Sequence, residues 1–421
     1  MSAEAFSATP PAQRIAGLFD AGSIVDPQAR SLGSLCAGDG AIGGREVTIV
    51  ATDRQVAGGS LGVAEATALC ALMQHSHEEQ RAFIFCLDSA GARLDEGLPA
   101  LGAFRQLYRT MLDLRLAGMP LLALVGRDCF GGASMLAATC EHRVYSENSR
   151  LAMSGPAVIQ ALGGRSELDA SNIAAVTALM GGAARRQLST TDTLSSDTIL
   201  AYRTAALDWI GDRTRVDKPD LIQQHNRLGT RLMVQGMTPS APVDAGDNLP
   251  SMLQEIIPRD IQVHRTDGVL VARKGEGTSN AFFGFVDREP VGALAAWTLA
   301  GECLAFADER PGEAVTIFLD APGQAPTLRD ERVILSEYVA HLALVLSELR
   351  IRGHRVTLQV LGDAAGGIYV ALAAPAVRVV ALPGANVQVL PPAAVARVLR
   401  GRDAASGVED YMRAGVIDTL I

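Results

Sequence analysis

The chain of 421 residues is 48% hydrophobic and 20% charged, the composition of a globular protein with room for two domains. Its net charge of −9 argues against nucleic acid as a partner, because phosphate binding requires a concentrated basic surface. No apolar stretch is long enough to cross a bilayer and the first residues lack the pattern of a signal peptide, so we expect a cytoplasmic protein with no membrane partner.

Few residues are suited to hold a metal or a covalent cofactor. The six cysteines include no C-x-x-C pair, so their spacing predicts no metal site. The lysines are Lys218 and Lys274 alone, and neither lies in a biotin-attachment turn of the Ala-Met-Lys-Met type. We therefore expect no biotin attachment site and no cofactor bound to this chain.

Strands and helices alternate in the first half of the sequence. Residues 1–12 are expected to form a flexible tail, and 13–210 a first domain. Apolar and β-branched runs predict the strands, and helical spacing of apolar residues predicts the helices. The expected elements are helix 14–19, a strand within 46–56, helix 61–75, strand 83–87, helix 98–117, strand 121–125, helix 131–140, and strands 143–145 and 151–153.

A polar segment with scattered Pro and Gly, residues 211–262, is expected to connect this domain to a second one over 263–421. A helix over 221–234 is predicted inside the connector. The second half then repeats the order of the first. Its expected elements are strand 281–286, helix 291–306, strand 315–319, helix 331–350, strand 356–361, helix 366–374, and strands 378–382 and 386–390.

The two halves also share landmark residues in the same order at a nearly constant spacing. The corresponding positions are Asp53-Arg54 and Asp287-Arg288, Gly91 and Gly323, and Gly131-Gly132 and Gly366-Gly367. A long internal repeat is a statement about architecture. Together with the strand and helix alternation, it predicts an α/β fold of two similar domains that face each other.

In each half, two glycine-bearing turns follow consecutive strands, at the strand ends where α/β layers bind ligands. If Ala90-Gly91-Ala92 and Gly131-Gly132 lie side by side, their backbone N–H groups can converge on one oxygen, aided by the N-terminus of the helix that begins there. That arrangement is an oxyanion hole. A single Gly-Gly pair more often permits only a tight turn, but two pairs in matched contexts favour a site.

Three segments of the first half, Ser89-Ala-Gly-Ala-Arg93, Phe130-Gly-Gly-Ala-Ser134 and Ser154-Gly-Pro-Ala-Val-Ile-Gln160, resemble the carboxyltransferase branch of the crotonase superfamily. Asp320-Ala-Pro-Gly-Gln-Ala-Pro326 is similar to the gamma subunit of biotin-independent malonate decarboxylase, and the first half is similar to its beta subunit. The resemblance implies two tandem crotonase-like (ClpP/crotonase) domains of repeated ββα units, a beta-subunit-like domain fused to a gamma-subunit-like domain.

The same resemblance implies an activity and partners. The implied reaction is decarboxylation of a malonyl thioester on an acyl carrier protein, which gives the acetyl thioester and CO2. The carrier would bear a prosthetic group derived from dephospho-coenzyme A, or the substrate would carry coenzyme A itself. A separate malonyl/acetyl transferase subunit would load the malonyl group, and self-association is also open.

Roles for individual residues follow from the resemblance. Gly91, Ala92, Gly131 and Gly132 would hold the enolate oxygen through backbone N–H groups. The second pair of turns would orient the departing carboxylate or a protonating water. Its residues are Gly323, Gln324, Gly366 and Gly367.

Other candidates contact the substrate or supply the final proton. Ala90 and Arg93 adjoin the first glycine turn and are expected to contact the substrate. Tyr369, Gln324, Cys129 and Asp88 are candidate proton donors, and no spacing singles one out; for Tyr369, packing of its ring inside a helix is the alternative.

Three other functions stay open. The first is a biotin-dependent acyl-CoA carboxyltransferase, in which the second glycine pair would hold the biotin carbonyl. The second is a serine hydrolase, which needs a Ser-His-Asp set. The third is a non-catalytic assembly subunit, because Ile368 and Tyr369 could obstruct the second site. The acyl group, malonyl or methylmalonyl, is open as well.

Overall fold

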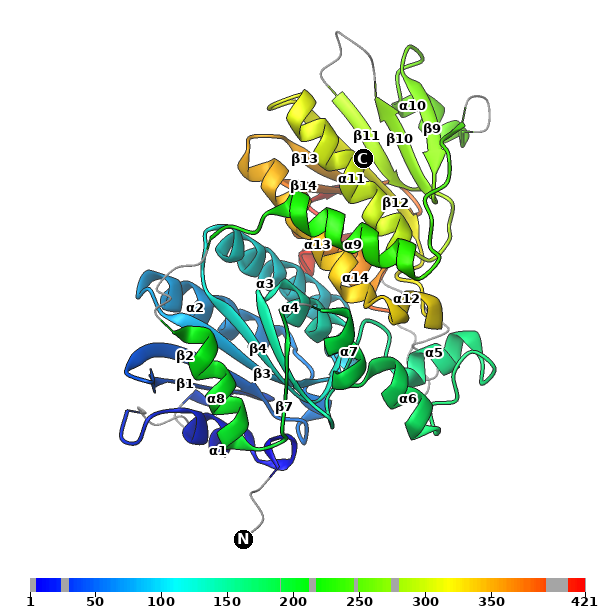
Figure 1. Ribbon diagram of the computed structural model, residues 1–421. Helices are drawn as coiled ribbons and strands as arrows, with labels where there is room; N and C mark the ends of the chain where they lie inside the picture. Colours follow the sequence, from blue (N-terminus) through cyan, green and yellow to red (C-terminus); the bar gives the residue numbers. More distant parts are fainter. Residues whose placement is uncertain are drawn as a thin grey trace.

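The computed structural model describes residues 5–23, 30–189, 191–211, 217–245, 249–273, 280–390 and 408–420. They form two α/β domains, each built on a largely parallel sheet (Figure 1). The predicted α/β class is therefore confirmed. Within the described part of the chain, no helix combines the length and apolar character that a bilayer-spanning segment requires.

The first domain has a seven-stranded sheet in the order β1-β2-β3-β4-β5-β7, with β6 paired to β4. The β1–β2 pair is antiparallel and the other pairs are parallel. The strands are β1 (Leu35–Ile42), β2 (Arg45–Thr52), β3 (Ala82–Ser89), β4 (Leu121–Phe130), β5 (His142–Ser146), β6 (Arg150–Ala152) and β7 (Thr193–Ser195).

Helices cover both faces of this sheet, so its central strands β3 and β4 begin with continuous apolar runs rather than an alternating pattern. Every residue of β3 is buried. The helices are η1 (Phe6–Ala8), α1 (Pro11–Leu18), η3 (Ala57–Gly59), α2 (Val63–Glu78), η4 (Leu94–Glu96), α3 (Leu98–Leu116), α4 (Gly132–Thr139), α5 (Pro156–Gly163), α6 (Ile173–Met180), α7 (Gly182–Leu188) and α8 (Ile199–Ile210).

The second domain has a nine-stranded sheet in the order β16-β14-β13-β12-β11-β10-β9-β8, with β15 paired to β13. Its strands are β8 (Val243–Asp244), β9 (Gln262–Thr266), β10 (Val269–Arg273), β11 (Asn280–Phe285), β12 (Ala314–Ala321), β13 (Val356–Ala365), β14 (Arg378–Ala381), β15 (Asn386–Gln388) and β16 (Thr419–Leu420). The helices from the connector onward are α9 (Leu221–Val234), α10 (Ser251–Ile256), α11 (Ala293–Glu309), α12 (Leu328–Arg332), α13 (Leu335–Ile351), α14 (Gly366–Ala373) and α16 (Val408–Arg413).

The duplication extends to a shared irregularity in the two sheets. The register of β3 on β4 shifts at Asp88, and the register of β12 on β13 shifts at the corresponding Asp320. In each case the aspartate carboxylate accepts a backbone N–H from the neighbouring strand, that of Asp128 at 3.1 Å and that of Asp363 at 3.0 Å. Both shifts lie just before a glycine turn and so help to aim it.

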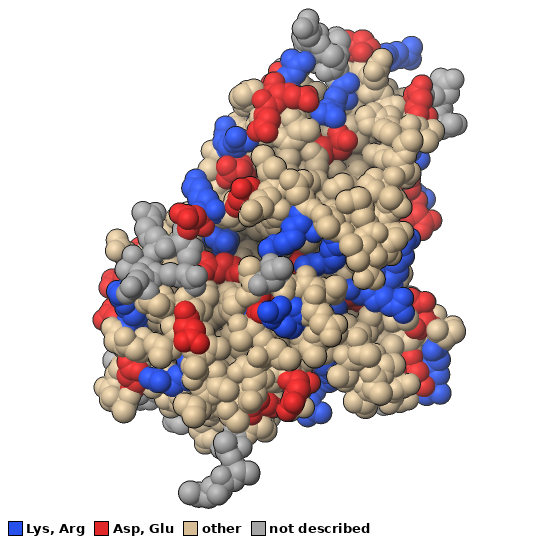
Figure 2. All heavy atoms as spheres, in the orientation of Figure 1, with Lys and Arg blue, Asp and Glu red and all other residues tan. Residues whose placement is uncertain are grey.

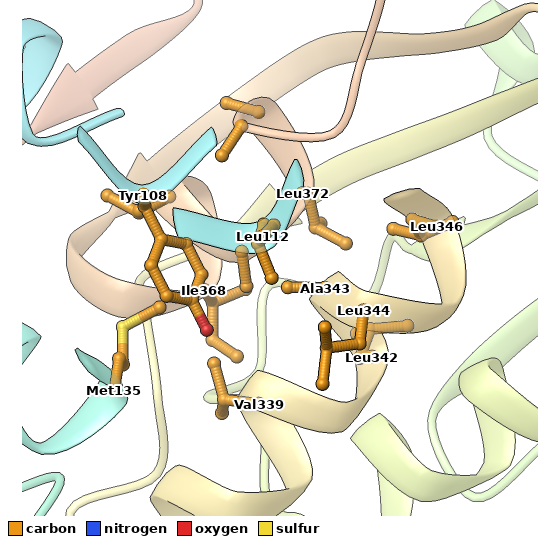
Figure 3. Packing of buried hydrophobic residues seen from close by; sticks show 14 of the residues in the cluster. Tyr108, Leu112, Met135, Val339, Leu342, Ala343, Leu344, Leu346, Ile368 and Leu372 are labelled. Carbon is orange, nitrogen blue, oxygen red and sulfur yellow. The ribbon is translucent and has the colours of Figure 1, made fainter. Parts of the chain in front are cut away.

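The two domains pack through corresponding helices in a reciprocal way. Helix α4 of the first domain lies on α13 of the second, while α14 of the second lies on α3 of the first. Figure 3 shows this junction, where Tyr108 and Leu112 of α3 meet Ile368 and Leu372 of α14, with Val339 of α13 alongside. One continuous apolar core therefore joins the two halves, with the glycine turns at its edge.

The structure differs from the sequence expectations at both ends of the first domain. The predicted flexible tail is wrong for residues 5–12, since Phe6 is fully buried and stacks on Tyr202 with ring centroids 3.9 Å apart; residues 1–4 lie outside the described residues. The connector is largely built into the second domain. Helix α9 packs on α11 and α13, and β8 pairs with β9.

Candidate active site

A cavity of about 390 Å³ lies where the glycine turns of both domains meet. From the first domain it is lined by Ala90, Ala92, Gly131 and Gly132, and from the second by Gln324, Gly366 and Gly367. The chain thus brings most of the predicted site residues around one space. Gly91 and Gly323, each next in sequence to a lining residue, are not part of this wall.

The two turns of the first domain touch each other, and only glycine fits at their contact. Gly91 has φ +99°, and a methyl group on it would come within 3.0 Å of both the Gly132 nitrogen and the Phe130 oxygen. Gly131 has φ +56°. Positive φ is a conformation that side-chain-bearing residues rarely adopt. The predicted side-by-side placement of these turns is confirmed.

Hydrogen bonds decide which N–H groups of these turns can serve a ligand. The N–H of Gly91 donates to Ser89 Oγ at 3.1 Å, and that of Gly131 donates to the Ala152 carbonyl at 3.2 Å. Among the described residues, no acceptor lies on the N–H of Ala92 or Gly132. The candidate donors are therefore Ala92 and Gly132, and not Gly91 and Gly131, whose amides already hold the turns in place.

Local structure explains why these two amides face the cavity. Leu61 bonds to the backbone on either side of Ala92, which leaves the N–H of Ala92 directed away from Leu61. Gly132 is the first residue of α4, where an N–H has no partner within the helix and the helix dipole favours negative charge. The ring of Phe104 occupies the place of a Gly132 side chain.

The second domain repeats the turns but uses one amide differently. Gly323 and Gly366 have φ +126° and +59°, matching Gly91 and Gly131. The Gly367 N–H, which corresponds to that of Gly132, donates to Gln324 Oε1 at 3.3 Å. The second domain's counterparts of Ala92 and Gly132 are Gln324 and Gly367. Of their two backbone N–H groups, only that of Gln324 has no acceptor among the described residues. The second pair is therefore half occupied by the protein.

Most of the cavity wall is apolar, and the sequence did not predict these residues. They are Leu94, Leu101, Phe104, Phe130, Met135, Met153, Pro156, Val158, Val370, Val389 and Leu390. They come from five separate stretches of the sequence, 94–104, 130–135, 153–158, 370 and 389–390, so no single local pattern could have grouped them. Such a wall excludes water and strengthens the field of the backbone donors.

Polar groups line one part of the same wall. Arg54 and Arg150 both pair with Asp128, each at 2.6 Å, and the three side chains line the cavity. Arg54 is 43% exposed and Arg150 lies over the ring of Phe130. The sequence marked Arg54 only as a landmark of the repeat; its place at the site depends on the pairing with Asp128, which spacing does not reveal.

A carboxylate of the second domain fixes another part of the wall. Glu331 of α12 is fully buried and accepts the backbone N–H groups of Ser154 and Met153, at 2.6 and 3.3 Å. Arg185 lies 3.6 Å away. Burial raises the pKa of Glu331 to about 7 despite these partners. Glu331 thus positions the turn that begins α5, across the domain boundary.

Some predicted residues lie away from the cavity. Arg93 binds Glu65, Glu96 and the Ser60 carbonyl instead of facing the substrate space. Tyr369 is fully buried and its hydroxyl donates to the Val416 carbonyl. We therefore correct both assignments: Arg93 anchors the turn and Tyr369 packs in the core.

The other two candidate proton donors are also used within the fold. Asp88 is 1% exposed and pairs with Arg14 at 3.2 Å. Cys129 is fully buried, and burial raises the pKa of its thiol. Neither lines the described cavity wall. The described residues also contain no group of three or more His, Cys, Asp or Glu placed to bind a metal ion.

The two domains match two different family models. Residues 13–209 match the carboxyl transferase domain family, and residues 286–417 match the malonate decarboxylase gamma subunit family. The first domain is therefore similar to carboxyl transferase domains, and the second is similar to the malonate decarboxylase gamma subunit. These matches support the predicted resemblance in part, and the fusion of a beta and a gamma subunit stays a prediction.

The similar proteins include relatives named for acyl-CoA carboxylation and relatives named for reactions of malonate or malonyl groups. A Bacillus subtilis (strain 168) protein named "Putative propionyl-CoA carboxylase beta chain" is 26% identical over 90% of this chain and 75% of its own length. The Malonomonas rubra protein "Malonyl-S-ACP:biotin-protein carboxyltransferase MADC" is 27% identical over 40% of this chain and 58% of its own length. A solved Pseudomonas malonate decarboxylase hetero-tetramer with malonate matches 55% of this chain and 92% of one of its chains, at 24% identity and a TM-score of 0.50, which shows the shared fold.

Proposed function

We propose that this cavity decarboxylates a malonyl thioester. The observation that carries the proposal is a pair of N–H groups, those of Ala92 and Gly132, that have no acceptor within the described part of the chain and lie at an apolar space lined by both domains. As the bond to the carboxylate carbon breaks, its electron pair moves to the thioester oxygen as an enolate. Donors aimed at that oxygen bind the transition state better than the ground state, and each is typically worth about 2.7–4 kcal/mol.

The products follow from that step. CO2 leaves with no further bond to form, and a proton delivered to the α-carbon yields the acetyl thioester. The described wall holds no histidine, so a Ser-His-Asp set is not assembled there and the hydrolase alternative loses support. Ile368 and Tyr369 lie in the core and do not obstruct the space, which removes the argument for a non-catalytic subunit.

We further propose that the thioester arrives on an acyl carrier protein loaded by a separate transferase. Lys and Arg side chains gather along the junction of the two domains on the face shown in Figure 2. Arg54 and Arg150 stand at the cavity. Guanidinium groups bind phosphate well, which suits either the phosphate of a carrier's prosthetic group or an acidic carrier surface.

The second candidate function is biotin-dependent carboxyl transfer. The observation that favours it is the match to the Bacillus subtilis relative over 90% of this chain. In that reaction the carboxyl group passes between an acyl thioester and biotin on another protein.

One assay separates the two functions. The purified chain is given malonyl-CoA or a malonyl carrier protein without biotin or ATP, and CO2 release is measured. Release with turnover supports decarboxylation. If no CO2 is released and the thioester is consumed only when biotin is added, the result supports carboxyl transfer instead. The same assay with methylmalonyl thioesters shows which acyl group the chain accepts.

A further inference from the structure

The two halves differ at one corresponding position of the glycine turns. Ala92 and Gln324 occupy the same place, since Ala92 bridges to Leu61 and Gln324 bridges to Val291 in the same parallel pattern. The methyl group of Ala92 cannot reach the amide of the facing turn. The longer side chain of Gln324 does reach it and bonds to the Gly367 N–H.

The amide oxygen of Gln324 stands where the oxygen of a bound carbonyl compound would stand. It accepts the Gly367 N–H at 3.3 Å, and a methyl group placed on Gly366 would meet it at 2.8 Å. It therefore lies directly over the Gly366-Gly367 turn. A carboxamide and a cyclic urea present the same kind of oxygen to an N–H donor, so one excludes the other.

Packing keeps the occupied turn in place. The side of Gly367 that would carry a side chain faces the Met153 Cε and Met135 Sδ atoms of the first domain. These methionines also line the cavity. The Gly367 N–H thus has little freedom to turn toward another acceptor while α14 stays packed on the first domain.

We propose that Gln324 is a specificity-determining residue that closes the second half of the site to a carboxyl acceptor of the cyclic urea class. This inference rests on the proposed decarboxylation in the first half. With an acceptor present, a urea nitrogen would bond to the CO2 carbon and its proton would be transferred to the enolate carbon. With Gln324 in place, CO2 leaves and the proton comes from water.

The test measures binding of free biotin, and of 2-imidazolidone as the smallest cyclic urea, by isothermal titration calorimetry without any thioester. The full-length chain is compared with Gln324→Ala, which removes the amide, and with Gln324→Asn, whose oxygen is one methylene too short to reach Gly367. Thermal unfolding checks that each variant is folded, and either variant suffices if the other fails. We expect at least a tenfold lower Kd for both ureas in the variants.

A second measurement follows the carboxyl label from carboxyl-labelled malonyl-CoA in the presence of biotin. We expect all of it in CO2 for the wild type and a measurable fraction in carboxybiotin for the variants. Equal urea binding by the wild type and the folded variants, or no binding by any of them, would overturn the role of Gln324. Because binding is measured without turnover, that result is distinct from a wild type that releases no CO2, which would overturn the proposed function.

Discussion

At the scale of single residues, the main-chain amides of the glycine turns differ in whether the fold already uses them. The amides of Gly91 and Gly131 hold the turns, whereas those of Ala92 and Gly132 face the cavity without acceptors among the described residues. The sequence predicted the turns and named all four residues as candidate donors, but it could not separate the two bonded amides from the two unbonded ones. Glycine content shows where the backbone can bend, not which N–H remains unbonded after folding.

The second half suggests how to close the first. Ala92→Gln should place an amide oxygen on the Gly132 N–H, as Gln324 does on Gly367. Loss of one oxyanion donor lowers kcat by roughly 10²–10³-fold, and we expect a loss of that size in CO2 release. The matched control is Ala183→Gln on the exposed side of α7. Ala92→Gln activity within threefold of the wild type would show that this donor does not act.

The aspartates at the two sheet irregularities differ in their arginine partners. Arg14 is 4% exposed and pairs with Asp88, whereas Arg288 is 77% exposed and pairs with Asp320. Arg14→Ala leaves a buried carboxylate without its partner, and burial already raises the pKa of Asp88. We expect a loss of about 3–5 kcal/mol in the free energy of unfolding, measured with urea.

Arg288→Ala is the comparison for that variant, because an exposed pair contributes little to stability. It should unfold close to the wild-type midpoint. Equal losses of unfolding free energy in Arg14→Ala and Arg288→Ala would mean that the buried ion pair stabilises the fold no more than the exposed one.

At the scale of elements, the backbone conformation of Gly91 in the turn after β3 affects the position of the Gly132 N–H. Gly91 and Gly44 both have positive φ, +99° and +75°, but only Gly91 has backbone atoms within 4 Å of the place of a methyl group. Replacement of either by Ala should cost roughly 1–2 kcal/mol of stability from the strained backbone.

Only Gly91→Ala should also reduce decarboxylation, because its methyl group pushes against the turn that carries the Gly132 N–H. We expect at least a tenfold lower kcat for Gly91→Ala and wild-type kcat for Gly44→Ala. Urea unfolding and CO2 release, measured on the same samples, separate the two effects. Loss of activity in both variants would point to general destabilisation.

The predicted elements failed where the cause of a structure is not local. Buried strands such as β3 and β12 were predicted because continuous apolar runs identify them. Strand β1 was missed because Gly38, Asp39 and Gly40 interrupt its pattern, although pairing with β2 stabilises it. The predicted helix 331–350 is divided into α12 and α13 at Ile334, whose φ is +64°. With this break, Glu331 faces the first domain. Tertiary packing determines that direction, and the periodicity of apolar residues cannot predict it.

At the scale of the whole molecule, the repeat predicted two facing domains but not the faces that meet. The domains meet through α3 and α4 of the first domain and α13 and α14 of the second. The short helix of each domain packs on the long helix of the other. Their apolar surfaces look like ordinary core positions in the sequence. The cavity exists only because this junction sets the glycine turns of both domains at its edge, so the site belongs to neither half alone.

A pH dependence should follow from Glu331, the buried carboxyl group that spans this junction. Burial raises its pKa to about 7 from an ordinary value of 4.5, so between these values the folded protein binds more protons than the unfolded one. The stability from this group is therefore fully present below pH 4.5 and is lost as the pH rises through 7, by about 3 kcal/mol in total. Glu337, whose pKa is lowered to about 2 by Arg143 and Arg231 against the effect of burial, loses its contribution as the pH falls from 4.5 to 2 and so does not interfere between pH 5 and 8.

The variant Glu331→Gln removes this titration while keeping the size of the side chain. We expect the difference in unfolding free energy between wild type and Glu331→Gln to shrink or change sign in favour of the variant as the pH rises from 5 to 8. Urea titrations at several pH values measure that difference directly. If the unfolding free energies of the two proteins change with pH in parallel, Glu331 is already ionised at pH 5. In that case Arg185 and the Ser154 N–H stabilise its charge by more than burial destabilises it.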